Sequence, residues 1–254
     1  MSFSKDVACI IAEYLAKYEL LDWIDIEKLS WRGLSSNINA IDLLRVNPDK
    51  IIWGALSMNP NAIDLLKEYP NKIAWSQLST NPNAIDLLTA NKSKINWELL
   101  MNNKNAIDLI KTCPSKIYME FISPNPAAID ILKSHPDKIR WNDLSYNPAA
   151  IDLLTANQDK INWQWLSSNP AAIELLMSNP DKIDWNAISA NPAAIDLLRA
   201  NPDKIYWRYL SSNPSAIDIL KSNQDKINWI GLSSNYSIFE LKIDTKLITK
   251  LLEI

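Results

Sequence analysis

The sequence has little of the residues that build most active sites and disulfide frameworks. Of its 254 residues, 3 are glycine, 2 are cysteine and 1 is histidine. Scarce glycine argues against a glycine-rich phosphate loop. Two cysteines, Cys9 and Cys113, argue against a secreted disulfide framework and favour a reducing compartment. We therefore expect an intracellular, cytoplasmic protein.

Long apolar runs and a strong net charge are missing as well. The N-terminus has no basic region followed by an apolar stretch, so we expect no signal peptide. No run approaches the roughly 20 apolar residues that cross a bilayer, so we expect no membrane partner. The formal net charge of -3 offers no basic field for nucleic acid. With 47% hydrophobic residues, the chain can bury a sizeable core.

What the sequence does have is a strict internal repeat. The pattern Asn-x-x-Ala-Ile-Asp, with Glu for Asp once, recurs every 22 residues from Asn37 to Asn213. Nine units without insertion or deletion cover residues 37–234. We number the positions of each unit 1 to 22, starting at this Asn. Such tandem units predict a fold in which each unit packs on its neighbours.

Each unit predicts two short helices, as the unit 191–212 shows. Asn191 is a good N-cap and Pro192 suits the first helical position. Asn201-Pro202 ends the first helix, because proline cannot continue it. A second helix follows at about 207–211, with the residue at position 16 as its cap in several units. Helices this short need the neighbouring unit for stability.

The fold class predicted is therefore all-α: an α-solenoid of nine two-helix repeats with capping helices at both ends. Residues 1–36 form an N-terminal cap, with a helix over 1–21 and a half-repeat in which Trp31 and Leu34 are in frame. Residues 235–254 form a C-terminal cap, ending in a helix over 246–252. We expect both caps to cover exposed terminal repeats. A leucine-rich repeat is the alternative, but its asparagine would fall elsewhere in the unit.

The segments Asn-Pro-x-Ala-Ile-Asp-Leu-Leu (191–198) and Lys-Ile-x-Trp-x-x-Leu-Ser (204–211) carry a family resemblance. The chain resembles short tandem-repeat proteins of giant, mimivirus-like DNA viruses. The resemblance covers the repeats and leaves out both ends. It implies a repeat scaffold, located in the host cytoplasm or the virion, and it implies no catalytic activity.

Two repeated features allow a structural and a functional interpretation. Position 17 is Trp in all units except the one with Met119. We expect this row to form a continuous core, although it could also stack bases or sugars. Position 6 is acidic, position 9 is often basic and position 14 is always Lys. We expect a charge network between units, with a ladder of binding acids as the alternative.

Partner specificity is expected at the variable positions of the second helix. Position 19 carries Phe121, Trp165 and Tyr209 in alternate units, and positions 16 and 18 add Tyr118, Tyr206 and Arg208. Exposed aromatic residues with arginine are typical interface anchors. These six residues form the predicted partner-binding surface, with the three position-19 rings in a row on one ridge. Alternatively, they cover the edges of neighbouring units.

The function predicted is a non-catalytic scaffold for protein–protein interaction. The single histidine, His135, occupies a turn position usually filled by Asn, and no catalytic triad or metal-ligand cluster is apparent, so we expect no enzyme activity, metal or cofactor. The partner would be a viral or host protein. A nucleic-acid-binding repeat protein and a self-assembling structural protein are the alternatives, and the acidic ladder disfavours the first.

Overall fold

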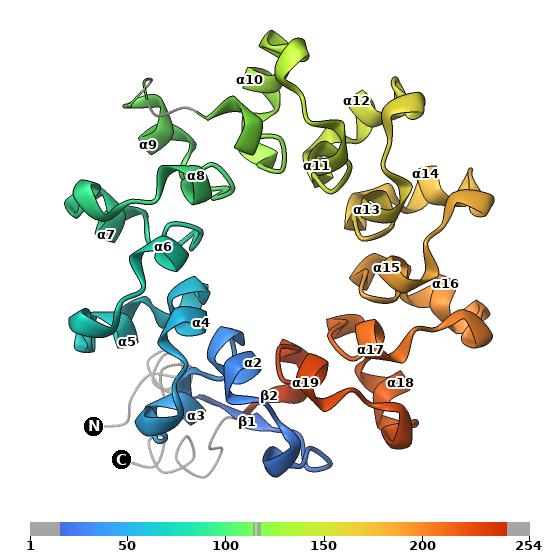
Figure 1. Cartoon of the computed structure of the whole chain (residues 1–254). Helices are drawn as coiled ribbons and strands as arrows, with labels where there is room; N and C mark the ends of the chain where they lie inside the picture. Colours follow the sequence, from blue (N-terminus) through green and yellow to red (C-terminus); the bar gives the residue numbers. More distant parts are fainter. Residues whose placement is uncertain (1–15, 114, 116–117, 243–254) are drawn as a thin grey trace, which may run out of the picture.

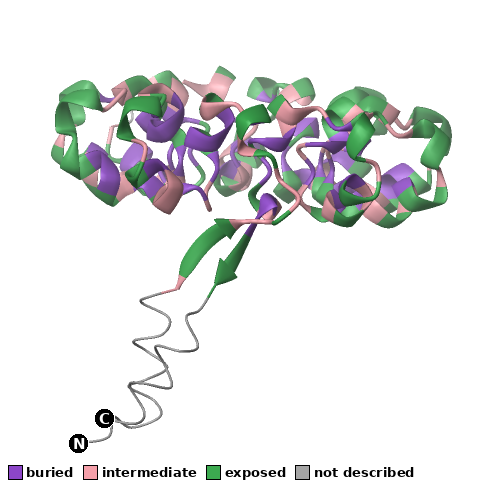
Figure 2. Ribbon diagram, turned by 90° about the horizontal axis from the view of Figure 1, so that it is seen from below, coloured by how far each residue is buried: buried purple, intermediate pink, exposed green. Residues whose placement is uncertain are grey.

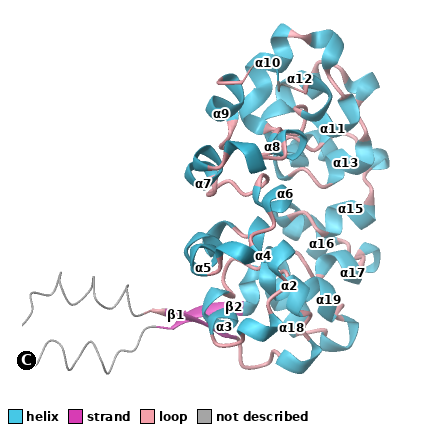
Figure 3. Cartoon of the chain, turned by 60° about the vertical axis from the view of Figure 1, so that its left-hand side comes forward, coloured by secondary structure: helices cyan, strands magenta, loops and turns pink. Residues whose placement is uncertain are grey.

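The computed structural model describes residues 16–113, 115 and 118–242, and over these ranges the chain forms a closed ring (Figure 1). The second helices of the units form an inner circle, and the first helices form an outer circle. The predicted all-α solenoid of two-helix repeats is confirmed. A two-stranded antiparallel sheet, formed by segments near the two ends of the chain, is the only sheet in the described part (Figure 3).

The inner circle begins and ends with helices that lie side by side, α2 and α19. Its elements are α2 (Trp31–Ser36), α4 (Trp53–Met58), α6 (Trp75–Leu78), α8 (Trp97–Leu100), the 3-10 turn η7 (Met119–Phe121), α11 (Trp141–Ser145), α13 (Trp163–Ser167), α15 (Trp185–Ser189), α17 (Trp207–Leu210) and α19 (Trp229–Leu232).

The outer circle contains one helix from each complete unit. Its helices are α3 (Ile41–Arg45), α5 (Ile63–Glu68), α7 (Ile85–Ala90), α9 (Ile107–Lys111), α10 (Ile129–Ser134), α12 (Ile151–Thr155), α14 (Ile173–Met177), α16 (Ile195–Ala200) and α18 (Ile217–Lys221). In most units 3-10 turns precede both helices, as Pro170–Ala172 and Pro180–Lys182 do around α14.

These short helices start where the sequence places a cap. The Asn169 side chain accepts a hydrogen bond from the Ala171 amide at the start of the first helix. The Asn162 side chain likewise accepts one from the Trp165 amide at the start of the second. Both bonds satisfy amides that a helix start leaves free. The predicted capping roles of positions 1 and 16 are thereby confirmed.

The core is a continuous band between the two circles (Figure 2). Ala at position 4 and Leu or Ile at positions 8 and 20 are fully or almost fully buried in every complete unit. In one unit these residues are Ala172, Leu176 and Ile188. Since each contributes to the contact with adjacent units, burial of this band supplies the main stabilisation of the ring.

A ladder of asparagine side chains runs through this core. Each position-1 amide Nδ2 donates two hydrogen bonds, one to the carbonyl of position 1 in the preceding unit and one to the carbonyl of position 21 in the unit before that. Asn169 does so to the carbonyls of Asn147 (3.0 Å) and Ser145 (3.1 Å). The same pair of bonds is made by Asn37, Asn59, Asn81, Asn103, Asn125, Asn147, Asn191, Asn213 and Asn235. Buried carbonyls need such partners, so position 1 both caps a helix and joins two units.

The ring closes because the two ends of the chain complete one further unit together. Asn235 and the turn Tyr236–Ile238 (η18) supply its first positions, while the turn Ile26–Lys28 (η1) and α2 supply its last. The strands β1 (Lys17–Leu20) and β2 (Phe239–Lys242) pair in antiparallel register where the first helix would lie. The half-repeat predicted around Trp31 is thus one part of a split tenth unit.

The bonds across this seam repeat those between ordinary units. Asn37 donates to the carbonyls of Ser233 (3.1 Å) and Asn235 (3.0 Å), which closes the ladder. The Ser30 amide donates to Ser233 Oγ at 2.7 Å. Lys28 Nζ lies 4.9 Å from the centre of the Trp229 ring. The seam is therefore a unit contact like the others, although no peptide bond crosses it.

The chain ends do lie against the first and last complete units, but as two parts of one split unit and not as separate caps on an open solenoid. The first and last complete units contact the split unit, so neither is exposed as a solenoid end. Residues 17–20 of the predicted N-terminal helix form β1 instead, because they pair with residues 239–242. The remainder of that helix and the predicted helix 246–252 lie outside the described residues.

The tryptophan row at position 17 is half-buried at the edge of the core, where a fully buried row was expected. Lysine side chains lie over the faces of these rings. In each case the Nζ atom is 4.3–4.9 Å from the centre of a Trp ring in the preceding unit, and the lysines are Lys28, Lys50, Lys94, Lys160, Lys204 and Lys226. The position-14 lysines were expected to meet position-6 acids. Five of them, Lys50, Lys94, Lys160, Lys204 and Lys226, contact a ring face instead, because its negative quadrupole attracts an ammonium. Lys138 and Lys182 pair with the adjacent Asp137 and Asp181.

The predicted pairing of positions 6 and 9 does occur on the outer circle. Lys67 lies 3.2 Å from Asp64, and Arg199 lies 3.3 Å from Asp196. Both pairs are exposed, so each contributes a few tenths of a kcal/mol at about the level of other surface pairs. Each of these ion pairs lies within one helix, so they do not hold the units of the ring together.

Two neighbouring tryptophans of α13 provide a matched test of the core. Trp163 packs against the core, whereas Trp165 is 45% exposed. We expect Trp163→Ala to lower the free energy of unfolding by about 3 kcal/mol, and Trp165→Ala by less than about 1 kcal/mol. Urea midpoints of the two variants check this. Equal midpoints would show that position 17 is not part of the core.

Candidate functional site

The surface that varies from unit to unit faces the centre of the ring. In α13, Leu166 and Ser167 are buried, and this helix contacts α14 of the outer circle. At 100° per residue, positions 18, 19 and 22 lie on the opposite side of the helix. We call the surface formed by these three positions the inner wall. Its backbone repeats while its side chains differ, so it is the part of the ring that can recognise a particular partner.

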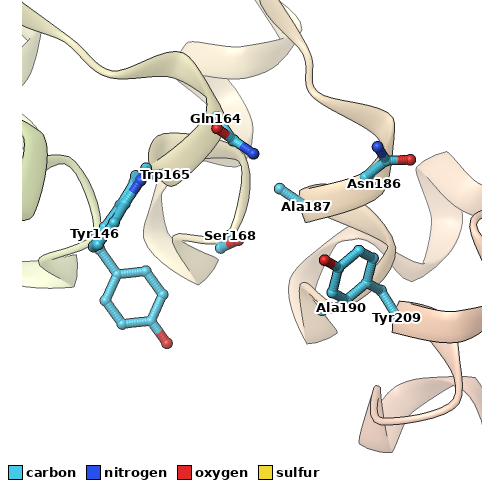
Figure 4. A pocket seen from close by; sticks show the side chains of 8 residues that line it. All are labelled: Tyr146, Gln164, Trp165, Ser168, Asn186, Ala187, Ala190 and Tyr209. Atoms are coloured by element: carbon cyan, nitrogen blue, oxygen red, sulfur yellow. The ribbon is translucent and has the colours of Figure 1, made fainter. Parts of the chain in front are cut away.

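A hollow of about 370 Å³ lies on the inner wall beside α11, α13, α15 and α17 (Figure 4). We call it the aromatic hollow, because three rings line it: Tyr146, Trp165 and Tyr209. They are 45–49% exposed. Such large rings in contact with solvent are typical of binding surfaces, since burying them on association releases much apolar area.

Polar groups complete the aromatic hollow. Gln164 and Ser168 come from α13 and the residue after it, and Asn186 comes from α15; Ala187 and Ala190 leave space between the rings. None of the residues described here as lining it is charged. Amide and hydroxyl groups beside rings can hydrogen-bond a peptide backbone while the rings contact its side chains. The hollow therefore suits an uncharged segment.

Two residues of the predicted surface, Trp165 and Tyr209, lie in this hollow, and Tyr206 packs on Tyr209 with ring centres 5.4 Å apart. Tyr146 was missed, because it stands at position 22, a variable position that the sequence analysis did not use. The sequence did contain a signal for it, because Tyr146 is the only aromatic residue at position 22 of the nine units.

The other predicted residues lie elsewhere. Phe121 is half-buried and packs against the core, 6.4 Å from the ring of Tyr118. Arg208 is exposed on the inner wall outside the aromatic hollow. The six residues therefore do not form one patch. The three position-19 residues Phe121, Trp165 and Tyr209 follow the curve of the inner wall, and only the side chains of Trp165 and Tyr209 are exposed.

The described residues contain no cluster of three His, Cys, Asp or Glu side chains that could hold a metal ion. His135 takes the place of a turn asparagine, and its Nδ1 lies 3.0 Å from the Ile131 carbonyl. Asn157 makes the same contact with the Leu153 carbonyl one unit later, at 2.9 Å. His135 is thereby a turn residue, as expected. Among the described helices, none combines the length and apolar character needed to cross a bilayer.

Comparison with known families gives one match. The model of the family described as periplasmic copper-binding protein (NosD) matches residues 27–240, which span the nine units and most of the split tenth. The chain belongs to this family. No curated protein and no solved structure matches it. The predicted likeness to giant-virus repeat proteins stays a prediction.

The family description corrects the expected location. It names a periplasmic protein, which contradicts the intracellular, cytoplasmic location predicted from the sequence. That prediction depended on the low cysteine content of the chain. A low cysteine count excludes a disulfide framework, but a periplasmic protein stabilised by a large repeat core needs no disulfides. Composition therefore could not decide the compartment.

Proposed function

We propose that this repeat scaffold holds an extended segment of a protein partner against its inner wall and is not an enzyme. The observation that supports the proposal is the aromatic hollow, in which Tyr146, Trp165 and Tyr209 are exposed at variable positions of an otherwise repeated surface. Tyrosine and tryptophan are the residues that most often dominate binding energy at interfaces. The repeated units supply a fixed frame for them.

An uncharged protein segment fits the aromatic hollow better than a nucleic acid does. The hollow has no cation to neutralise phosphate. Arg140, at the start of the preceding helix α11, forms an ion pair with Asp143, with 3.0 Å between its Nε and the carboxylate, so its charge is already neutralised. A partner held there would be bound by apolar contact and hydrogen bonds, so its affinity should change little with salt.

Copper, which the family description names, does not fit the described residues. Copper sites in proteins use His, Cys and Met ligands close together. Here Cys113 Sγ lies 3.7 Å from Thr112 Oγ1, and the His135 ring contacts a backbone carbonyl. Met101 is fully buried in the core. We therefore derive no function of this ring from a bound metal ion.

The proposal is tested with peptides selected on the wild-type ring from a random display library. In the variant Trp165→Ser/Tyr209→Ser, we expect their affinity to fall at least about 30-fold, since the loss of a single anchor worth about 2 kcal/mol already gives that factor. Titration calorimetry gives the affinities, and circular dichroism checks that the variant is folded.

Met177→Ser is the control, because Met177 is a large apolar residue at least as exposed as Trp165 and Tyr209 but lies on the outer helix α14. It should leave the affinity unchanged. Peptides that bind the double variant as tightly as the wild type would refute the proposal. Binding of a single-stranded oligonucleotide with a steep salt dependence would favour the nucleic-acid alternative.

A further inference from the structure

A second hollow, of about 460 Å³, lies on the inner wall at the seam. We call it the seam hollow. Arg32, Ile52, Gly54 and Met58 line it from the N-terminal side, and Ile230 lines it from the C-terminal side. It exists only when the ring is closed, because α2 must lie between α19 and α4.

The glycines of the chain explain why this part of the wall is hollow. All three, Gly33, Gly54 and Gly231, stand at position 18 or 19 of the three units around the seam. None has a positive φ, so the backbone does not require glycine. A Cβ atom on Gly33 would lie 2.4 Å from Ser233 Cβ, which makes glycine necessary for closure.

Gly54 has no such steric reason. A Cβ atom there would meet nothing within 4 Å. A glycine inside α4 costs up to about 1 kcal/mol relative to alanine, and nothing in the packing offsets this cost. What its missing side chain does achieve is to leave the seam hollow open.

The lining of the seam hollow is aliphatic and carries a positive charge. Ile52, Met58 and Ile230 are 41%, 49% and 71% exposed. Arg32 is exposed, and among the described residues it forms no ion pair. No carboxylate lines the hollow. Arg208 stands at the equivalent position one unit before Ile230 and Arg32 one unit after it, so Ile230 lies between two cations.

We propose that the seam hollow binds an aliphatic group that carries a carboxylate. The aliphatic part would cover Ile52, Met58 and Ile230, and the carboxylate would accept hydrogen bonds from the Arg32 guanidinium. This ligand chemistry occurs in a free medium-chain acid and in the C-terminal residue of a protein. The site goes beyond the function proposed above, because it shares no residue with the aromatic hollow. Since both chain ends build it, its ligand stabilises the closed ring by mass action.

The test uses decanoate, below the concentration at which it forms micelles, and follows the Met58 methyl signal by NMR. We expect saturable shifts with decanoate and none with decylammonium, which has the same chain and the opposite charge. Arg32→Gln should weaken decanoate binding about tenfold, as the loss of one charge-assisted bond implies. Gly54→Leu should abolish it by filling the hollow.

Asn142→Leu is the matched control, since it adds the same side chain at the same repeat position four units away. It should leave decanoate binding unchanged. The peptide Gly-Gly-Leu-Leu, with a free or an amidated C-terminus, distinguishes the sources. Tighter binding of the free peptide than of decanoate identifies a protein C-terminus, and the reverse identifies a free acid.

Three results would overturn the proposal: equal binding of decylammonium, unchanged decanoate binding by Gly54→Leu, or no binding of decanoate and of the free peptide alike. None of them concerns Trp165 or Tyr209. Failure here therefore leaves the proposed protein-binding function of the aromatic hollow standing, and failure of that function leaves the seam site standing.

Discussion

Replacing Asn169 by alanine is expected to lower the free energy of unfolding by about 4 kcal/mol. The Asn169 side chain is fully buried and makes three hydrogen bonds, two donated to the carbonyls of Ser145 and Asn147 and one accepted from the Ala171 amide. Alanine leaves the Ser145 carbonyl and the Ala171 amide without these partners, at about 1–3 kcal/mol each, whereas the Asn147 carbonyl keeps its hydrogen bond from the Ala150 amide. Urea unfolding followed by circular dichroism gives the value.

Two further variants separate the contribution of the Asn169 helix cap from that of its hydrogen bonds to neighbouring units. Asn169→Asp keeps the acceptor for Ala171 but turns an oxygen toward two carbonyls, so it should destabilise the ring at least as much as alanine. Asn157→Ala removes the bond to the Leu153 carbonyl at a half-buried turn, together with an exposed bond accepted from Lys160 Nζ, and should cost only about 1 kcal/mol. Equal losses in Asn169→Ala and Asn157→Ala would mean that the ladder contributes nothing beyond an ordinary turn.

The same substitution at two glycines is expected to have opposite effects. Gly33→Ala places a Cβ atom 2.4 Å from Ser233 Cβ and forces the seam apart, at about 2 kcal/mol of stability. Gly54→Ala meets nothing within 4 Å and should stabilise the protein by about 0.5–1 kcal/mol, because alanine is the better helix former. Both values follow from urea midpoints.

Hydrogen exchange locates the damage. The Ser30 amide donates to Ser233 Oγ across the seam, so its exchange should become faster in Gly33→Ala and stay slow in Gly54→Ala. The equivalent amide of Asp184, bonded to Ser167 Oγ within the array, is the internal reference. A stable Gly33→Ala variant with a protected Ser30 would contradict the seam geometry.

The repeat itself could be predicted from the sequence because its signals are local. Caps such as Asn191, prolines such as Pro192 and the apolar spacing of Ile195 and Leu198 each act within one helix. The row of Trp side chains was placed correctly on the second helix. Its half-exposure was missed, because the lysines over the rings come from the neighbouring unit, a contact that no single unit reveals.

Closure could not be predicted in the same way. It depends on a small rotation between adjacent units that must add up to a full turn, and no residue encodes that sum. One signal was present: residues 26–36 continue the frame of the repeat before Asn37, and residues 235–238 continue it after Ser234. Joined end to end, they make up most of one unit. The aromatic hollow depends on this curvature too, since the ring brings variable positions of several units to one concave wall.

The closed asparagine ladder also restricts how the gene can change. In an open solenoid, unequal recombination between repeats adds or removes a unit at the end of a stack with little effect on the rest. Here Asn37 must meet the carbonyls of Ser233 and Asn235, so the copy number is fixed by the circumference. A gained or lost repeat leaves the two ends out of reach or overlapping. By contrast, a circular permutant, cut between any two units and joined through the present chain ends, keeps every hydrogen bond of the asparagine ladder. The unit at which the gene starts can therefore change, whereas the number of repeats cannot.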